Sequence, residues 1–298
     1  MNDAKITAPM LRARKLRGPK IAMLTAYDAT MARLLDEGGA DVLLVGDSLG
    51  MVVQGLPNTL PVTLDEICYH GRAVVRATHR AHVVGDLPFM SYQSSVERGL
   101  ESAGQMLKTG GFEAVKLEGG QRFAGHVSAL VASGIPVMGH VGLLPQAVHA
   151  MGGFRVQGKA PVDAERVLDD ARAIAEAGAY AIVLEGIPSE LGQRISEAVA
   201  IPTIGIGAGP ACDGQVLVCY DFLGMYPSLK PKFVKHFAEL GAAIVAATQS
   251  YVKEVQEGSF PTAAQSFGAG SKPSPAETGA EPVLGAPPKS YGPASEDS

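Results

Sequence analysis

Five apolar segments of the chain each close on a side chain that could bind a metal ion or move a proton. The segments span residues 42–47, 82–86, 114–118, 136–140 and 181–185, and they end in Asp47, Asp86, Glu118, His140 and Glu185. Their length and β-branched content are typical of buried strands. Because burying an isolated charge is costly, these groups need partners, a bound ion or a catalytic purpose.

Convergent carboxylates repel one another unless a cation holds them together. Oxygen ligands favour Mg²⁺ or Mn²⁺ over zinc or copper, and Mg²⁺ leaves coordination positions for water and substrate oxygens. A substrate with adjacent oxygens suits such an ion, for example a 2-oxo acid that chelates through its carboxylate and ketone. The ion would then stabilise the enolate that forms when a neighbouring proton leaves.

Lys116 lies two residues before Glu118, so both side chains face the same side of a strand. A buried lysine needs an anion, which could be a substrate carboxylate, an enolate or one of the nearby acids. A Schiff base is a further alternative.

Three more side chains are candidates for the same chemistry. Glu185, held apart from the metal, could act as a general base. His140 could bind substrate or shuttle protons, or it could be structural. Ser48 follows Asp47 and could supply a hydrogen-bond donor.

These residues need a scaffold that brings strand ends together. Residues 21–26, 202–207 and 215–219 add three strand candidates, which makes eight, mostly alternating with helical segments. The runs are continuously apolar, as parallel strands covered on both faces should be. Since the carboxyl ends of such strands share one side, this count predicts a (β/α)8 TIM barrel with its site at that rim. A doubly wound open sheet is the alternative.

Helix ends are also marked in the sequence. Thr63 with Glu66, and Ser94 with Glu97, predict capping boxes, and Ser189 predicts another helix start. The last helix is expected over 229–257, with an apolar face that serves the core or a subunit contact. That face carries Phe233, Phe237, Leu240, Ile244 and Val252.

The domain organisation follows from composition. We expect a basic N-terminal arm at 1–20, a catalytic barrel at 21–258 and a disordered tail at 259–298, which is rich in Pro, Gly, Ala and Ser. The formal charge of −5 gives no reason to expect a nucleic-acid partner, and no apolar run is long enough for a membrane span. Three widely spaced cysteines favour a reducing, cytoplasmic location.

Several motifs, in order, resemble the ketopantoate hydroxymethyltransferase family over about residues 5–257. They read GDSLGMVVQG at 46–55, TLPVT at 59–63, DLPFM at 86–90, VKLEGG at 115–120, GHVGL at 139–143, VLE at 183–185 and GIGAG at 205–209. The resemblance implies a barrel of the phosphoenolpyruvate/pyruvate class. It also implies transfer of a one-carbon unit from 5,10-methylenetetrahydrofolate to 3-methyl-2-oxobutanoate, giving 2-dehydropantoate for pantothenate synthesis.

The resemblance also implies roles for single residues. The positions matching Asp47, Asp86 and Glu118 bind Mg²⁺ in that family, and the position matching Glu185 accepts the proton. Those matching Ser48, Asp86 and Lys116 contact the oxo acid, and we expect Asp47 and His140 to join them. The family is typically a cytoplasmic decamer built as a pentamer of dimers.

Two other functions are compatible with parts of this pattern. A Mg²⁺-dependent C–C lyase that cleaves a 2-oxo or 2-hydroxy diacid would share the metal chemistry but would not depend on folate. A non-catalytic barrel would have no use for convergent polar strand ends.

Overall fold

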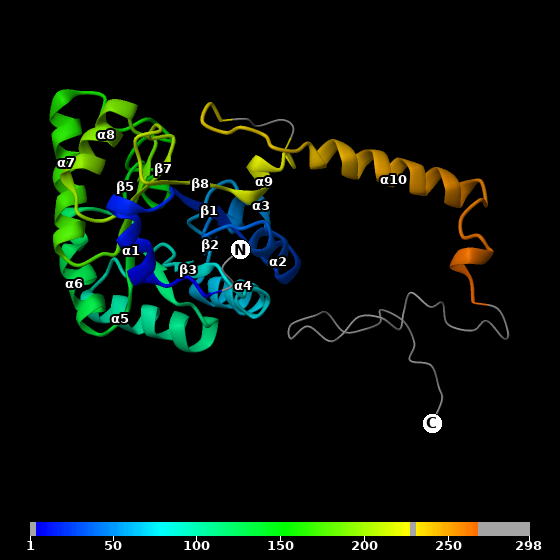
Figure 1. The fold of residues 1–298 in the computed structure, drawn as a ribbon, viewed down its shortest axis with the longest axis horizontal. Coiled ribbons are helices and arrows are strands. Elements are labelled where there is room, and N and C mark those ends of the chain that lie inside the picture. The colour runs from blue at the N-terminus through cyan, green and yellow to red at the C-terminus, as the bar shows by residue number, and fades with distance from the viewer. Residues whose placement is uncertain (1–3, 227–230, 268–298) are drawn as a thin grey trace.

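The computed structural model describes residues 4–226 and 231–267 and shows a closed barrel of eight parallel strands in sequence order (Figure 1). The strands are β1 Ile21–Thr25, β2 Val42–Val45, β3 His82–Asp86, β4 Ala114–Lys116, β5 Val137–Gly142, β6 Ala181–Glu185, β7 Thr203–Ile206 and β8 Gly214–Leu217. The barrel closes because β1 pairs with both β2 and β8. This confirms the predicted fold class and excludes the open sheet.

Helices follow most strands and cover the outside of the barrel (Figure 1). The longer ones are α2 Ala29–Glu37, α4 Leu64–Ala77, α5 Val96–Gln105, α6 Ala124–Ala132, α7 Pro161–Glu176 and α8 Ser189–Ala198. Short turns add α3 Leu49–Val52, α9 Cys219–Phe222, a π-helix η1 Met106–Gly110, and the 3₁₀ turns η2 Gln121–Phe123 and η3 Pro145–Ala147. In the described residues, no helix combines the length and apolar character that crossing a membrane requires.

The basic segment before β1 contains a helix, α1 Ala8–Arg17, where its composition indicated only a basic arm. Ile6 and Leu11 are buried in the same cluster as Met23 and Val42, which fill the barrel interior. Basic side chains on α1 pair with acids of the barrel, for example Lys15 Nζ with Asp213 Oδ2 at 2.7 Å. The basic side chains therefore hold α1 and the residues before it against the amino-terminal end of the barrel.

The predicted last helix begins later than expected. Helix α10 spans Leu240–Gln256, and no helix covers 231–239. Backbone groups of this segment bond to the end of α9 instead: the Phe237 N–H donates to the Phe222 carbonyl at 2.8 Å, and Leu240 to Leu223 at 2.9 Å. The prediction for 229–230 lies outside the described residues.

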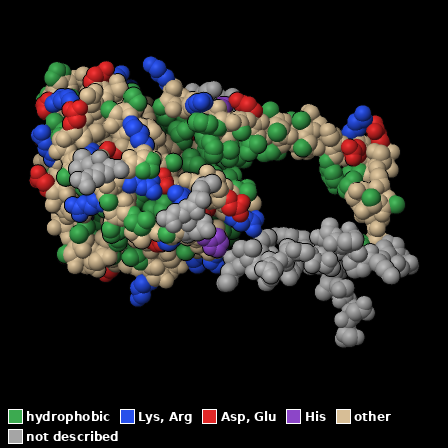
Figure 2. Space-filling view, in the orientation of Figure 1, with side chains coloured by type: hydrophobic (Ala, Val, Ile, Leu, Met, Phe, Trp, Pro, Cys, Tyr) green, Lys and Arg blue, Asp and Glu red, His purple; other side chains and the backbone are tan. Residues whose placement is uncertain are grey.

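Helix α10 extends away from the barrel, and none of its residues is buried (Figure 1). Its apolar face is therefore not part of this chain's core. Figure 2 shows hydrophobic side chains gathered beside the start of α10. The outward residues of β1 and β8 are also poorly covered: Ala22 and Gln215 are exposed, whereas β2, β3 and β4 are fully buried.

Two predicted helix caps are wrong, although α8 does begin at Ser189. Ser95, rather than Ser94, caps α5 by accepting from the Arg98 N–H at 3.2 Å. Helix α8 has Pro188 at its N-cap position, and Ser189 makes no capping bond. The Thr63 and Glu66 capping box is confirmed.

The predicted tail is described only in part. Residues 259–267 include one 3₁₀ turn, η4 Ala263–Gln265, with no buried residue. The predicted disorder of 268–298 lies outside the described residues.

Candidate active site

The structure brings the seven predicted site residues to one cavity of about 170 Å³ at the carboxyl ends of the strands. Its lining includes Asp47, Ser48, Asp86, Lys116, Glu118, His140 and Glu185. All seven lie on strands β3 to β6 or in the turns directly behind β2 and β4. We call this space the central cavity.

Lys116 and Asp86 form the closest ion pair in the central cavity. Lys116 Nζ lies 2.7 Å from Asp86 Oδ1 and 2.8 Å from Oδ2, and these two residues are register partners on β4 and β3. Burial alone would lower the pKa of Lys116, but the carboxylates of Asp86, Glu118 and Asp47 raise it. Because a Schiff base needs a neutral amine, this charge disfavours that alternative and supports pairing with an acid.

His140 stands between two carboxylates. Its Nδ1 lies 3.4 Å from Glu118 Oε1, and its Nε2 lies 3.2 Å from Glu185 Oε2. Burial would lower the pKa of His140, yet the carboxylates of Glu118 and Glu185 raise it to about 9. A pKa of about 9 favours the imidazolium at neutral pH, in which each ring nitrogen carries a proton and lies in ion contact, without a hydrogen bond, beside one of the two carboxylates.

The charged form of Asp47 is disfavoured in the central cavity. Burial raises the pKa of Asp47, and the neighbouring charges of Asp86 and Glu118 raise it further. The Asp47 backbone N–H also reaches Asp86 Oδ2 at 3.4 Å. The carboxylates of the cavity outnumber its two cations, Lys116 and His140, so an additional cation would relieve this repulsion.

The donor set fits a hard divalent cation completed by water and substrate oxygens. Glu118 Oε1 is buried and makes no hydrogen bond within the described part of the chain. No group of three or more His, Cys, Asp or Glu side chains is arranged there to hold an ion alone. Asp86 is bonded to Lys116, and Asp47 to Gln146. Mg²⁺ nevertheless needs only one or two protein carboxylates.

Sequence reasoning missed Gln146, which connects two of these carboxylates. Its Nε2 donates to Asp47 Oδ2 at 3.0 Å and to the Leu87 carbonyl at 2.9 Å, while its backbone N–H donates to Glu118 Oε2 at 3.0 Å. Gln93 Nε2 and the Tyr92 hydroxyl donate to Gln146 Oε1. No spacing rule selects one amide in the loop after β5, so only its position beyond a strand end could have marked it.

Ser48 has a partner that the sequence did not reveal either. Its Oγ lies 2.8 Å from the hydroxyl of Tyr27, which is buried behind β1. The tyrosine hydroxyl therefore orients the serine hydroxyl. In this orientation Ser48 can form a hydrogen bond with a polar group of a ligand in the central cavity.

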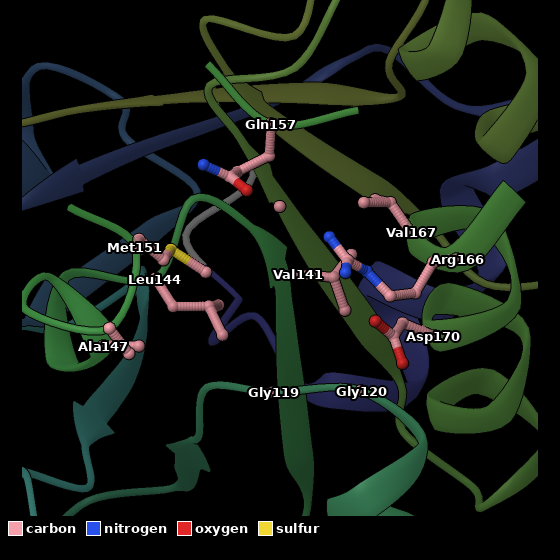
Figure 3. Close-up of a pocket in the computed structure, with 12 residues that line it drawn as sticks. Gly119, Gly120, Val141, Leu144, Ala147, Met151, Gln157, Arg166, Val167 and Asp170 are labelled. Carbon is pink, nitrogen blue, oxygen red and sulfur yellow. The ribbon is translucent and has the colours of Figure 1, made fainter. Parts of the chain in front are cut away.

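A second hollow of about 320 Å³ lies beside the central cavity, between the loop after β5 and helix α7 (Figure 3). We call it the side cavity. Its lining includes Gly119, Gly120, Val141, Leu144, Met151, Gln157, Arg166, Val167 and Asp170.

Comparison with known proteins gives a consistent result over most of the chain. The sequence model described as "Ketopantoate hydroxymethyltransferase" matches residues 5–263. A 3-methyl-2-oxobutanoate hydroxymethyltransferase from Trichlorobacter lovleyi is 56% identical over 88% of this chain and 98% of its own length. One from Carboxydothermus hydrogenoformans is 55% identical over 88% of this chain and 95% of its own.

Solved structures resemble the chain in fold. A phosphoenolpyruvate phosphomutase from Streptomyces platensis subsp. rosaceus has a TM-score of 0.57 at 17% identity, over 85% of this chain and 88% of its own. A 2,3-dimethylmalate lyase has a TM-score of 0.56 at 19% identity, over 85% and 86% of the two chains. The chain folds as this class of barrel, and by its sequence it belongs to the ketopantoate hydroxymethyltransferase family of enzymes.

Proposed function

We propose that the protein transfers a hydroxymethyl group from 5,10-methylenetetrahydrofolate to 3-methyl-2-oxobutanoate, giving 2-dehydropantoate for pantothenate synthesis. The names of its relatives support this reaction. The observation that carries it in this chain is the division of the central cavity. The Lys116 and Asp86 pair lies on one side. On the other side Glu185 forms an ion pair with His140 and with no other side chain in the part of the protein that the structure describes.

Asp47, Asp86 and Glu118 would hold Mg²⁺ on the first side. When bound, the ion supplies Lewis-acid polarisation of the 2-oxo group and so favours loss of the neighbouring proton. A solved phosphonopyruvate hydrolase, similar in fold at 14% identity, is a complex with oxalate and Mg²⁺.

The chain's own groups perform the remaining work. The Lys116 ammonium and the Ser48 hydroxyl bind the oxo acid, and His140 holds the Glu185 carboxylate toward the cavity. Glu185 accepts the proton from C3. The resulting enolate carbon forms a bond to the methylene carbon of the folate as the first of that carbon's two C–N bonds breaks. The water oxygen then bonds to the same carbon as the second C–N bond breaks. Tetrahydrofolate leaves with its two nitrogens protonated, by the proton that Glu185 took from C3 and by one from the water.

Substitution of the base tests this proposal directly. We expect Glu185→Gln to slow the exchange of the C3 hydrogen of 3-methyl-2-oxobutanoate with deuterated water by about 10²–10⁴-fold, because the amide cannot accept the proton. Exchange is followed by NMR with Mg²⁺ and without folate. Glu190→Gln, on the exposed first turn of α8, is the matched control. Undiminished exchange in Glu185→Gln would remove Glu185 as the base.

The C–C lyase is the competing function, and the 2,3-dimethylmalate lyase shares the fold at 19% identity. Folate dependence separates the two, since a lyase turns over its diacid without added folate. The family membership favours the transferase.

The proposal extends to assembly and location. A homo-oligomer, a decamer built as a pentamer of dimers, would cover the exposed apolar face of α10 and the bare outer side of β1 and β8. A cytoplasmic location agrees with the free state of Cys68, Cys212 and Cys219.

A further inference from the structure

We propose that the side cavity binds the 2-amino-4-oxopyrimidine ring of the reduced folate. This inference rests on the proposed function, because that reaction requires a folate beside the central cavity. The oxo acid and its metal account for the polar groups of the central cavity but for none of those in the side cavity.

The walls of the side cavity suit a flat ring. Figure 3 shows Leu144 and Met151 on one side and Val167 on the other, with Val141 between them. The floor is formed by the backbone of Gly119 and Gly120. Apolar walls with a few convergent polar groups are the usual surroundings of a heterocyclic ligand.

Asp170 and Arg166 provide the polar groups on the α7 side (Figure 3). Asp170 is fixed in place, because its Oδ1 accepts from the Gln121 N–H at 2.9 Å. It also packs against Gly120, where an added Cβ would lie 2.0 Å from the Asp170 Cγ. A carboxylate held in this way can accept from the ring N–H and the 2-amino group of a pterin.

Arg166 complements that carboxylate. Its Nη2 lies 3.1 Å from Asp163 Oδ1, a contact that leaves further donors of the guanidinium for a ligand. The 4-oxo group of the pterin is an acceptor of the matching kind. One acid and one base on adjacent turns of α7 therefore fit a ring with donors and an acceptor along one edge.

The side cavity is placed to deliver a one-carbon unit. Neighbouring residues line the two cavities in turn: Glu118 and His140 line the central cavity, while Gly119 and Val141 line the side cavity. The loop after β5 contributes to both, through Leu144 and Pro145. A ring in the side cavity would thus adjoin the cavity proposed for the oxo acid, along β4, β5 and the loop after β5.

Substitution of Asp170 tests the inference with tetrahydrofolate as the probe, measured by isothermal titration calorimetry on the intact protein. Asp170→Asn keeps an oxygen for the Gln121 N–H but replaces the other carboxylate oxygen with a donor. We expect the Kd for tetrahydrofolate to rise about tenfold or more. Asp169→Asn, on the same helix and paired with Arg172, is the matched control and should leave the Kd unchanged.

Arg166→Leu is a second variant, compared with Arg172→Leu. Both side chains are largely exposed, at 61% and 48%, so neither change should affect folding. We expect Arg166→Leu alone to weaken tetrahydrofolate binding. An unchanged Kd in both Asp170→Asn and Arg166→Leu would overturn the side cavity as the folate site.

Folate-independent C3 exchange separates this inference from the proposed function. We expect Asp170→Asn to exchange the C3 hydrogen at the wild-type rate, because the side cavity does not touch the oxo acid. Absence of exchange in the wild-type protein would refute the proposed function. Normal exchange together with unchanged tetrahydrofolate affinity in the variants would refute the side cavity alone.

Discussion

At the residue scale, Gln146 shows what a strand-end pattern cannot reveal. The charged residues were predictable because buried charge at the end of an apolar run needs an explanation. Their partners were not, since Gln146 and Tyr92 lie in loops with no periodicity to mark them. The pairing of Lys116 with Asp86 was one of several alternatives in the sequence, and strand register selected it.

Replacing Gln146 should weaken the proposed metal site more than the fold. Gln146→Leu removes the donor to Asp47 but keeps the backbone N–H bond to Glu118. We expect about 10–100-fold weaker Mg²⁺ binding, as for other partners that orient metal ligands. Titration with Mn²⁺, followed by electron paramagnetic resonance, measures the affinity. Gln105→Leu, at an exposed site on α5, should bind Mn²⁺ normally. Equal affinities in the two variants would contradict this role.

At the element scale, helix starts were predictable where the side chains themselves make the cap. Thr63 and Glu66 form both bonds of the capping box, whereas Ser94 lies one residue before the N-cap of α5 and Ser189 is the first residue of α8 rather than its cap. The start of α10 could not be predicted, because backbone bonds to α9 replace helical bonds over the preceding segment. The local sequence does not indicate that hydrogen bonds to another part of the fold will replace helical hydrogen bonds.

The capping box of α4 gives a pH-dependent prediction. The backbone N–H of Thr63 and then its hydroxyl lower the pKa of Glu66, so its contribution to stability is present at neutral pH. That contribution is lost as the pH falls through the ordinary range of a glutamate, about 4.3, toward the lowered folded value.

We therefore expect Thr63→Ala to cost about 1 kcal/mol at pH 7, and less at pH values below that range. Urea unfolding at a series of pH values measures the difference. Thr262→Ala removes a similar cap from η4, which has no buried residue, and should leave the barrel transition unchanged. A loss that does not vary with pH would show that Glu66 is not involved.

At the scale of the whole molecule, the barrel itself was the most predictable feature. Eight continuous apolar runs have few ways to bury both faces in parallel, and closure satisfies every strand edge. The sequence could not show that α10 leaves the barrel, because its apolar face is the same whether it covers this chain or another.

Charge on the exposed face of α10 should therefore disrupt assembly. Ile244 and Val252 are 52% and 42% exposed, and we expect the pair Ile244→Glu and Val252→Glu to give smaller particles than the wild type. Light scattering coupled to size-exclusion chromatography measures the mass. Ser250→Glu, on another side of the helix, is the control. A wild-type mass for the double variant would exclude this face from the interface.

The alternation of side chains along β4 and β5 has an evolutionary consequence. Glu118 and His140 line one cavity while Gly119 and Val141 line the other, so the two linings share a backbone but no side chain. Substitutions can accumulate in one lining while the other is inherited unchanged. A lineage, or a directed-evolution library, can therefore alter the cavity beside α7 and still retain the titratable side chains at the centre of the barrel.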